Sequence, residues 1–360
     1  MPDVRAWGGA HSSEFQRDIV ESTRQEEAAG AAYATGETLR QYDALAISGG
    51  GASGAFGAGF LNGWSAAGTR PKFKIVTGIS TGALIAPFAF LGSDYDEELR
   101  QLYTTMSTKN IIDINNVFTI LFRSESFANS DPLQRLVAEH IDEEMLQVIA
   151  DRHHAGYRLY IGTTNMDAQR LSVWNMGRIA TYGTEQALEL FREILVASAS
   201  IPAAMPPVMI EVEVDGRRYD EMHTDGGTTT QVFFYAGTID LDEAAREANI
   251  SMSTNSIYVI RNGRLGPEFD AIDRKLPAIS NRALSTMIKT AALNNLFRIY
   301  AFALRDDIEF HYVSIPESHT SEASEMFDNE EMKRLYQLGY ELALSEDPWV
   351  DEPPGLNMLE

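Results

Sequence analysis

The chain has 360 residues, and its 29 Lys and Arg against 52 Asp and Glu give a formal net charge of −23. The basic residues are scattered, which argues strongly against nucleic-acid binding because that function needs a clustered basic face. The negative charge also disfavours docking onto anionic lipid by charge alone. Cysteine is absent, so disulfides are excluded. The sequence contains no run of about 18 apolar residues, so it predicts no membrane-spanning segment. The first residues lack the apolar stretch of a signal peptide, and the sequence leaves the compartment open.

Hydrophobic residues make up 44% of the chain, enough for a large core. We expect one large α/β domain over residues 42–345, since such folds exceed the usual single-domain length. A helical extension at residues 1–41 precedes it, with a polar surface helix from Glu14 to Ala29. A loose tail at residues 346–360 follows it.

The domain opens on an apolar strand that runs into a glycine-rich loop. Asp43 to Ser48 reads as a buried strand, Gly49-Gly50-Gly51-Ala52-Ser53-Gly54 follows, and an apolar helix begins at Ala55. The spacing fits G-x-G-x-x-G, but a dinucleotide site needs an acidic residue about 20 positions later. No Asp or Glu occurs between Gly54 and Asp94, so nucleotide binding is disfavoured. The loop better fits bare backbone N–H groups that hold an oxyanion at a helix N-terminus; a turn that only packs helix on strand is the alternative.

A serine stands at the next strand-to-helix junction. Phe73 to Thr77 reads as a buried strand, Gly78-Ile79-Ser80-Thr81-Gly82 matches G-x-S-x-G, and Ala83 to Ala86 opens an apolar helix. In this setting a sharp turn exposes the serine hydroxyl, and Gly78 and Gly82 let the backbone pass without Cβ clashes. Ser80 is therefore the candidate nucleophile.

The alternation of strands and helices from Tyr42 to Leu91 predicts a parallel sheet. Further elements are expected as helices at Asp94–Thr108, Glu185–Ala197 and Asn281–Leu304, and as strands at Tyr157–Thr164, Arg170–Trp174 and Ser256–Arg261. The apolar segment Ile111–Phe122 is interpreted either as a buried cap segment or strand, or as a lid or acyl-chain wall over the Ser80 cleft, because ligand pockets are mostly apolar.

Ser80 needs a base, and two kinds are available. An α/β-hydrolase would use a late His after an acid, and only His311 and His319 are late enough. His311 lies in an alternating, strand-like segment and is expected to be partly buried, whereas His319 lies in a polar loop and is expected to be solvated. The other candidate is the carboxylate of Asp225.

Asp225 heads the triplet Asp225-Gly226-Gly227, which follows a predicted hairpin at Glu211–Tyr219 with an Asp215-Gly216 turn. The two glycines allow a tight turn and leave the carboxylate projecting into a cleft. An isolated Asp-Gly-Gly is usually only a turn, so its significance depends on the other two motifs.

The glycine loop, the Ser80 elbow and the Asp225 triplet together resemble the patatin-like phospholipase family, which has these motifs in this chain order. Ala197–Pro202 with Met205–Val208, and Phe327–Tyr340, are also similar to family segments, so the likeness spans residues 42–343. The resemblance implies a three-layer α/β fold with a central, mainly parallel sheet flanked by helices. It also implies a serine acyl hydrolase, a phospholipase A or lipid esterase, without cofactor or metal.

Carried onto this chain, the resemblance makes Ser80 the nucleophile and Asp225 its base. The oxyanion hole would be formed by the backbone N–H groups of Gly50 and Gly51, with those of Gly49, Ala52 and Thr81 as further candidates. The glycines that support the motifs are Gly54, Gly78, Gly82, Gly226 and Gly227. Ser53 stands where many members have Arg or Lys, so that positive charge is missing from the loop.

The implied reaction is acyl transfer from a lipid or small ester, through an acyl-enzyme. A free carboxylate with a pKa near 3.9 is a poor base for a hydroxyl, so we expect proton transfer to be concerted with attack. A lipid substrate would bring peripheral membrane contact; the oligomeric state is not fixed by the sequence. The alternatives are an α/β-hydrolase with a Ser-His-acid triad, and a lipid-binding or scaffold protein without activity.

Overall fold

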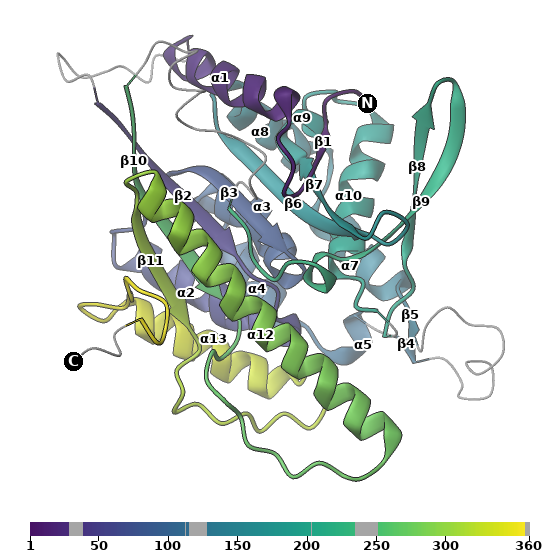
Figure 1. The fold of residues 1–360 in the computed structure, drawn as a ribbon, viewed down its shortest axis with the longest axis vertical. Coiled ribbons are helices and arrows are strands. Elements are labelled where there is room, and N and C mark those ends of the chain that lie inside the picture. The colour runs from purple at the N-terminus through teal and green to yellow at the C-terminus, as the bar shows by residue number, and fades with distance from the viewer. Residues whose placement is uncertain (29–38, 112, 115–127, 203, 235–250, 357–360) are drawn as a thin grey trace.

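The structure, a computed structural model, describes residues 1–28, 39–111, 113–114, 128–202, 204–234 and 251–356. Within these ranges nine strands form one central sheet, with helices on both faces (Figure 1). None of the described helices is long and apolar enough to span a bilayer.

The central sheet is mainly parallel, as predicted. Its strands are β1 (Arg5–Trp7), β2 (Leu39–Ile47), β3 (Phe73–Ile79), β6 (Arg158–Asn165), β7 (Arg170–Asn175), β8 (Val208–Val214), β9 (Arg217–Asp225), β10 (Ser251–Arg261) and β11 (Glu309–Ser314). The order is β1-β7-β6-β3-β2-β10-β11, and the run from β6 to β11 is parallel. The antiparallel strands gather at the other end, where β7 pairs with β1 and β6, and the β8–β9 hairpin joins β6. A separate small sheet pairs β4 (Asp113–Ile114) with β5 (Ala128–Asn129).

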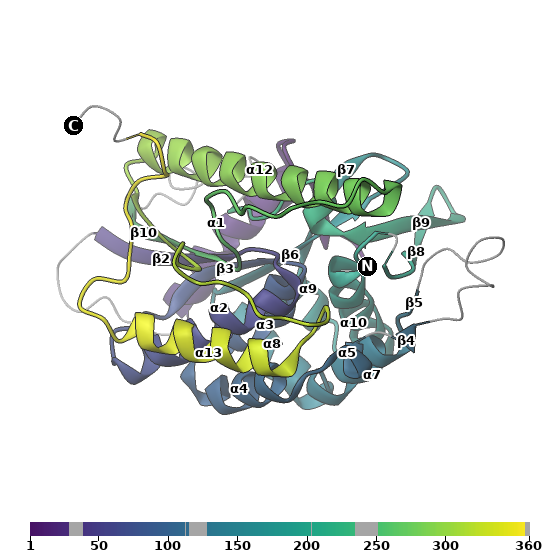
Figure 2. The ribbon, with the colours of Figure 1, turned by 90° about the horizontal axis from the view of Figure 1, so that it is seen from below.

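Two helices, α1 (Ser13–Ala28) and α12 (Leu276–Arg305), cover one face of the sheet (Figure 2). Successive residues of a strand point to opposite faces. Ala44 and Ala46 of β2 accordingly pack in the core beneath α1 and α12, whereas Leu45 and Ile47 pack in the larger core on the opposite face. Both faces of the central strands are therefore buried, as in sheets covered by helices on two sides.

The other face of the sheet carries most of the helices. They are α2 (Gly54–Ala66), α3 (Thr81–Leu91), α4 (Asp96–Thr105), α5 (Thr108–Ile111), α7 (Asp131–His140), α8 (Glu143–His154), α9 (Met176–Ala180), α10 (Glu185–Ala199) and α13 (Asn329–Ala343). Short 3₁₀ turns lie at Gly51–Ser53, Ser93–Tyr95 and Gly226–Thr228. Helices α2 and α13 touch through their backbones: a Cβ on Gly59 would lie 1.9 Å from the Tyr336 carbonyl oxygen.

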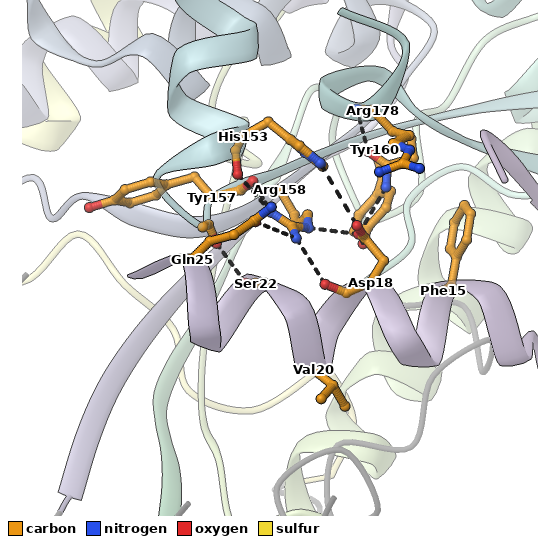
Figure 3. Close-up of polar contacts among 12 residues, drawn as sticks. Phe15, Asp18, Val20, Ser22, Gln25, His153, Tyr157, Arg158, Tyr160 and Arg178 are labelled. Atoms are coloured by element: carbon orange, nitrogen blue, oxygen red, sulfur yellow. Dashed lines mark hydrogen bonds and ion pairs between the residues drawn. The ribbon is translucent and has the colours of Figure 1, made fainter. Parts of the chain in front are cut away.

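A buried polar network anchors α1 to the sheet (Figure 3). The carboxylate of Asp18 accepts hydrogen bonds from Arg158 Nε at 2.6 Å and from Asn175 Nδ2 at 2.9 Å. Gln25 Oε1 accepts a further one from Arg158 Nη2 at 2.9 Å, and the Arg158 side chain is fully buried. His153 lies nearby, and burial lowers its pKa to about 3, so it is neutral at neutral pH. The N-terminal helix is thus held on the domain by the Asp18–Arg158 ion pair, by a second pair between Glu26 and Lys74 of β3 at 2.8 Å, and by apolar packing.

The predicted elements around the motifs are confirmed, with small shifts at their ends. The long C-terminal helix begins at Leu276 rather than at Asn281, and the predicted hairpin is formed by β8 and β9. Strand β1 and helices α7, α8 and α9 were not predicted. The lid hypothesis rests on residues 111–122, of which 112 and 115–122 lie outside the described residues.

Candidate active site

Ser80 stands at the turn from β3 into α3, in a conformation that L-residues rarely adopt. Its φ is 55° and its ψ is −124°; such strain, which typically costs about 1–3 kcal/mol, is common at functional sites. Both flanking glycines are required by close packing. A Cβ on Gly78 would lie 2.4 Å from the Gly82 carbonyl oxygen, and one on Gly82 would lie 2.3 Å from that of Ile47.

The register of the sheet brings Asp225 to Ser80. Strand β7 pairs along one edge of β6, so β3 and β9 share the other edge. On that edge, Ile79 of β3 pairs with Gly162, and Asp225 of β9 pairs with the next residue, Thr163. The two strands run in opposite directions and meet at their carboxyl ends. Ser80, directly after Ile79, therefore faces Asp225.

The two side chains are in direct contact. Ser80 Oγ donates a hydrogen bond to Asp225 Oδ2 at 2.6 Å, and both residues are buried. This length is typical of a hydroxyl bonded to a carboxylate. The other carboxylate oxygen, Oδ1, accepts a hydrogen bond from Gly227 N at 2.6 Å. The carboxylate is thus fixed on both oxygens, one of them aimed at the serine.

Burial raises the pKa of Asp225 to about 6, although the hydrogen bonds from Ser80 and Gly227 act in the opposite direction. The pKa of Asp225 therefore lies well above the value near 3.9 of a free carboxylate. The cause is desolvation, which disfavours the charged form of a carboxyl group. A carboxylate with this pKa is better matched to proton transfer near neutral pH.

The three loop glycines differ in what their N–H groups do. The N–H of Gly49 donates to the Gln231 carbonyl at 2.9 Å, so it is occupied, and this argues against Gly49 as an oxyanion donor. Gly51 has φ +56°. Within the part of the chain that the structure describes, the N–H groups of Gly50 and Gly51 donate to no protein acceptor. A Cβ on Gly50 would lie 2.1 Å from the Asn262 carbonyl oxygen, so this position admits only glycine.

The remaining motif glycines allow backbone segments to approach one another closely. A Cβ on Gly54 would lie 2.0 Å from Thr81 Oγ1, and one on Gly226 would lie 2.5 Å from the Gly162 carbonyl oxygen. Gly227 is confined by the side chain of Gln231. The glycine loop, the elbow and the Asp225 turn are therefore packed directly against one another.

Two side chains at the end of β10, those of Arg261 and Asn262, hold the glycine loop, and the sequence analysis did not single them out. Arg261 Nη1 donates to the Gly49 carbonyl at 2.7 Å and to Ser48 Oγ at 3.1 Å. Asn262 donates from Nδ2 to the Ser48 carbonyl at 2.9 Å and accepts from Gly57 N at 3.0 Å. Both residues are buried, and burial lowers the pKa of Arg261 to about 10. The sequence signal is that these two polar residues directly follow the apolar run Ile257–Ile260.

A third contact that the sequence did not predict comes from α10. Ser198 Oγ accepts a hydrogen bond from the backbone N–H of Ser80 at 2.9 Å and donates one to the Gly162 carbonyl at 2.7 Å. The backbone N–H of Ser80 is therefore already hydrogen-bonded within the protein. Ser198 ties the elbow to β6 beneath it.

With the geometry described, the relatives can be considered. The family model described as patatin-like phospholipase matches residues 45–236, just over half of the chain, and includes every predicted site residue. The chain belongs to the patatin-like phospholipase family. Membership supports lipid ester hydrolysis as its general activity.

A solved structure similar to this family member is VipD from Legionella pneumophila. The two are 12% identical with a TM-score of 0.41, over 84% of this chain and 66% of that one. No curated protein sequence matches the chain.

The two late histidines lie apart from Ser80 Oγ and bond to other carboxylates. His311 Nδ1 lies 2.6 Å from Asp351 Oδ1, and His319 Nε2 lies 2.9 Å from Glu331 Oε1. The expected partial burial of His311 is confirmed. The expectation that His319 is solvated is wrong: the buried carboxylate of Glu331 draws it into the wall of the Ser80 pocket.

Ser80 and Asp225 lie at the bottom of a pocket of about 670 Å³, within the usual range for small-molecule sites. The glycine loop and Arg261 form part of its wall. A larger apolar part of the wall comes from α12 and the neighbouring segments, and includes Leu284, Met287, Ile288, Ile315 and Leu335. The pocket thus combines the polar dyad and several charged side chains, among them Glu268 and Lys289, with a larger apolar surface, which suits an ester with an acyl chain.

Proposed function

We propose that the chain is a serine acyl hydrolase that cleaves carboxylic ester bonds of lipids, a phospholipase A or lipid esterase, through a Ser80–Asp225 dyad. The observation that carries this proposal is the 2.6 Å hydrogen bond from Ser80 Oγ to Asp225 Oδ2 in a pocket with an apolar wall. Family membership supports the general reaction class.

In the first half-reaction, Ser80 Oγ attacks the ester carbonyl carbon while its proton passes to Asp225. The carbonyl oxygen becomes an oxyanion, held by the N–H groups of Gly50 and Gly51. When the intermediate collapses, the bond to the alcohol breaks and the Asp225 proton goes to the leaving oxygen. In the second half-reaction, Asp225 takes a proton from water, the resulting hydroxide oxygen attacks the acyl-enzyme, and the proton returns to Ser80 as the fatty acid leaves.

Arg261 is a positioning residue in this proposal. Its guanidinium bonds to the Gly49 carbonyl, which belongs to the same peptide group as the Gly50 N–H. A positive charge on the carbonyl side makes that N–H a stronger donor, because hydrogen bonds in a chain polarise one another. Arg261 thus supplies from β10 the positive charge that Ser53 does not provide within the loop.

The test is a hydrolysis panel of a phospholipid, a lysophospholipid, a triacylglycerol and a dispersed p-nitrophenyl ester. Ser80→Ala should abolish turnover, and Asp225→Asn should lower kcat by at least about 10²-fold, the usual contribution of a general base. His311→Gln and His319→Gln should retain turnover. Loss of activity in either His variant with full activity in Asp225→Asn would refute the dyad, and a wild-type chain inactive on every ester would refute the function.

A further inference from the structure

The first half of α12 is exposed almost all round, unlike the second half. Leu276 is 78% exposed and Met287 is 68% exposed, whereas burial against the sheet begins only at Ala292. Figure 1 shows this end of α12, in the darker green, running past the sheet. An exposed run of large apolar side chains on a helix normally marks an interaction site.

These apolar side chains share one side of the helix. Leu276, Ile279, Leu284 and Met287 follow the spacing i, i+3, i+8 and i+11, which places them on one face; we call this set the α12 apolar patch. Ala292 comes sixteen residues after Leu276, about 4.4 turns at ~3.6 residues per turn, and so lies on nearly the opposite side. The patch therefore faces away from the surface by which α12 packs on the sheet.

The α12 apolar patch is continuous with the wall of the Ser80 pocket. Leu284 and Met287 belong to both, so the exposed helix face extends into the lining of the pocket that holds the nucleophile. Phe269, 98% exposed, follows directly on Glu268, which also lines the pocket. A partner seated on the patch would thus cover the mouth of the pocket.

The charge of this helix fits a phosphate-bearing surface. Over its 30 residues α12 contains Arg282, Lys289, Arg298 and Arg305 but no Asp or Glu, in a chain whose net charge is −23. Lys289 pairs with Glu268 and Arg305 with Asp306, both outside the helix, but the helix itself presents no carboxylate to lipid phosphates. Elsewhere on the chain the excess of acidic residues would oppose such an approach.

We propose that the α12 apolar patch docks on the surface of a phospholipid bilayer and opens the Ser80 pocket toward it. This inference rests on the proposed function, since the shared residues Leu284 and Met287 place the docked helix face beside the pocket into which an acyl chain must pass. The docked helix lies in the interface with its apolar side chains among the lipids and its basic ones near the phosphates.

The test measures binding to phosphatidylcholine vesicles by co-sedimentation, with Ser80→Ala as the background so that no lipid is consumed. The test variant is Leu276→Asp with Ile279→Asp, two positions outside the pocket wall. The matched control is Leu304→Asp, 65% exposed at the other end of the same helix. The test variant should bind vesicles at least about tenfold more weakly, because each apolar side chain gains over a kcal/mol on leaving water; the control should bind as the background does.

The same substitutions in the active chain separate docking from chemistry. Hydrolysis of vesicle lipid should fall in the test variant, while hydrolysis of a dispersed short-chain ester should stay unchanged. Equal vesicle binding by test variant and background would overturn the proposal, as would a background chain that does not bind. A dimer that forms through the patch and is lost in the test variant, with vesicle binding retained, would assign the patch to a second copy and also overturn it. If the wild type cleaves no ester, the proposed function fails, but the binding comparison still decides the docking.

Discussion

Replacing Asp225 by Asn should raise the stability of the protein while it removes the activity. The pKa of Asp225 lies at about 6 in the folded chain, against 3.8 for an ordinary Asp. The folded state holds the proton of Asp225 more tightly than the unfolded state does. The contribution of this carboxyl group to stability is therefore complete below about pH 3.8 and is lost as the pH rises through about 6. The full difference corresponds to about 3 kcal/mol. Asn resembles the protonated carboxyl at every pH, so the variant escapes this loss.

The assay is urea unfolding of the wild type and Asp225→Asn at about pH 5 and about pH 8. The free energy of unfolding of Asp225→Asn, minus that of the wild type, should be larger by about 1.4 kcal/mol at the higher pH than at the lower one. This is the part of the full pKa effect that develops between these two pH values. Asp220→Asn, at an exposed position of the same strand, should show no such gain. A constant difference between Asp225→Asn and the wild type at the two pH values would refute the argument that burial raises this pKa.

Three further changes test the surroundings of the dyad and the anchoring of α1. Gly50→Ala should lower kcat/KM by roughly 10²–10³-fold, the usual cost of a lost oxyanion donor, because its Cβ would lie 2.1 Å from the Asn262 carbonyl oxygen. Arg261→Met should lower kcat about tenfold with little change in KM for a neutral ester, since it weakens a donor without removing it, and Arg261→Lys should restore part of the loss. Asp18→Asn should lower the free energy of unfolding by about 3–5 kcal/mol, because it leaves the buried Arg158 guanidinium without its partner.

The prediction for each of these variants has a result that would contradict it. Gly50→Ala with wild-type kcat/KM would show that the loop amides do not hold the oxyanion, and Arg261→Met with unchanged kcat would remove the polarising role. For Asp18→Asn the control is Glu21→Gln, which breaks the exposed pair with Arg24 on the same helix and should cost less than about 1 kcal/mol. Equal losses in these two variants would mean that burial does not decide the strength of the Asp18 pair.

The kcat/KM of the wild type should rise with pH through about 6, because Asp225 must lose its proton to act as a base. A profile measured on a dispersed ester tests this directly. A rise of kcat/KM whose midpoint lies near the usual pKa of a carboxylate would contradict this prediction. It would mean that Asp225 is more hydrated than its buried position indicates.

The sequence predicted the parts of the fold that depend on local patterns. The elbow at Ser80 and the glycine loop are each written in a few consecutive residues, because a strand, a turn and a helix have distinct periodicities and turn residues. The same holds for the β8–β9 hairpin, where the Asp215-Gly216 turn fixes the pairing. The association of Ser80 with Asp225 came from the resemblance of the three motifs, in this chain order, to the patatin-like phospholipase family.

Features that depend on distant contacts could not be predicted. The Gly49 N–H is occupied by Gln231, and Arg261 reaches its carbonyl from more than two hundred residues away, through the pairing of β10 with β2. The raised pKa of Asp225 depends on burial, which no local pattern records. His319 was misjudged for the same reason, since its partner Glu331 is buried in a later helix.

The central claim is that Ser80 is the nucleophile and is made reactive by Asp225. Its most direct test is covalent labelling with a fluorophosphonate, followed by mass spectrometry of the labelled peptide. The account predicts one adduct, on Ser80, that is absent in Ser80→Ala and forms much more slowly in Asp225→Asn. An adduct on another residue, or ester hydrolysis that persists in Ser80→Ala, would contradict it.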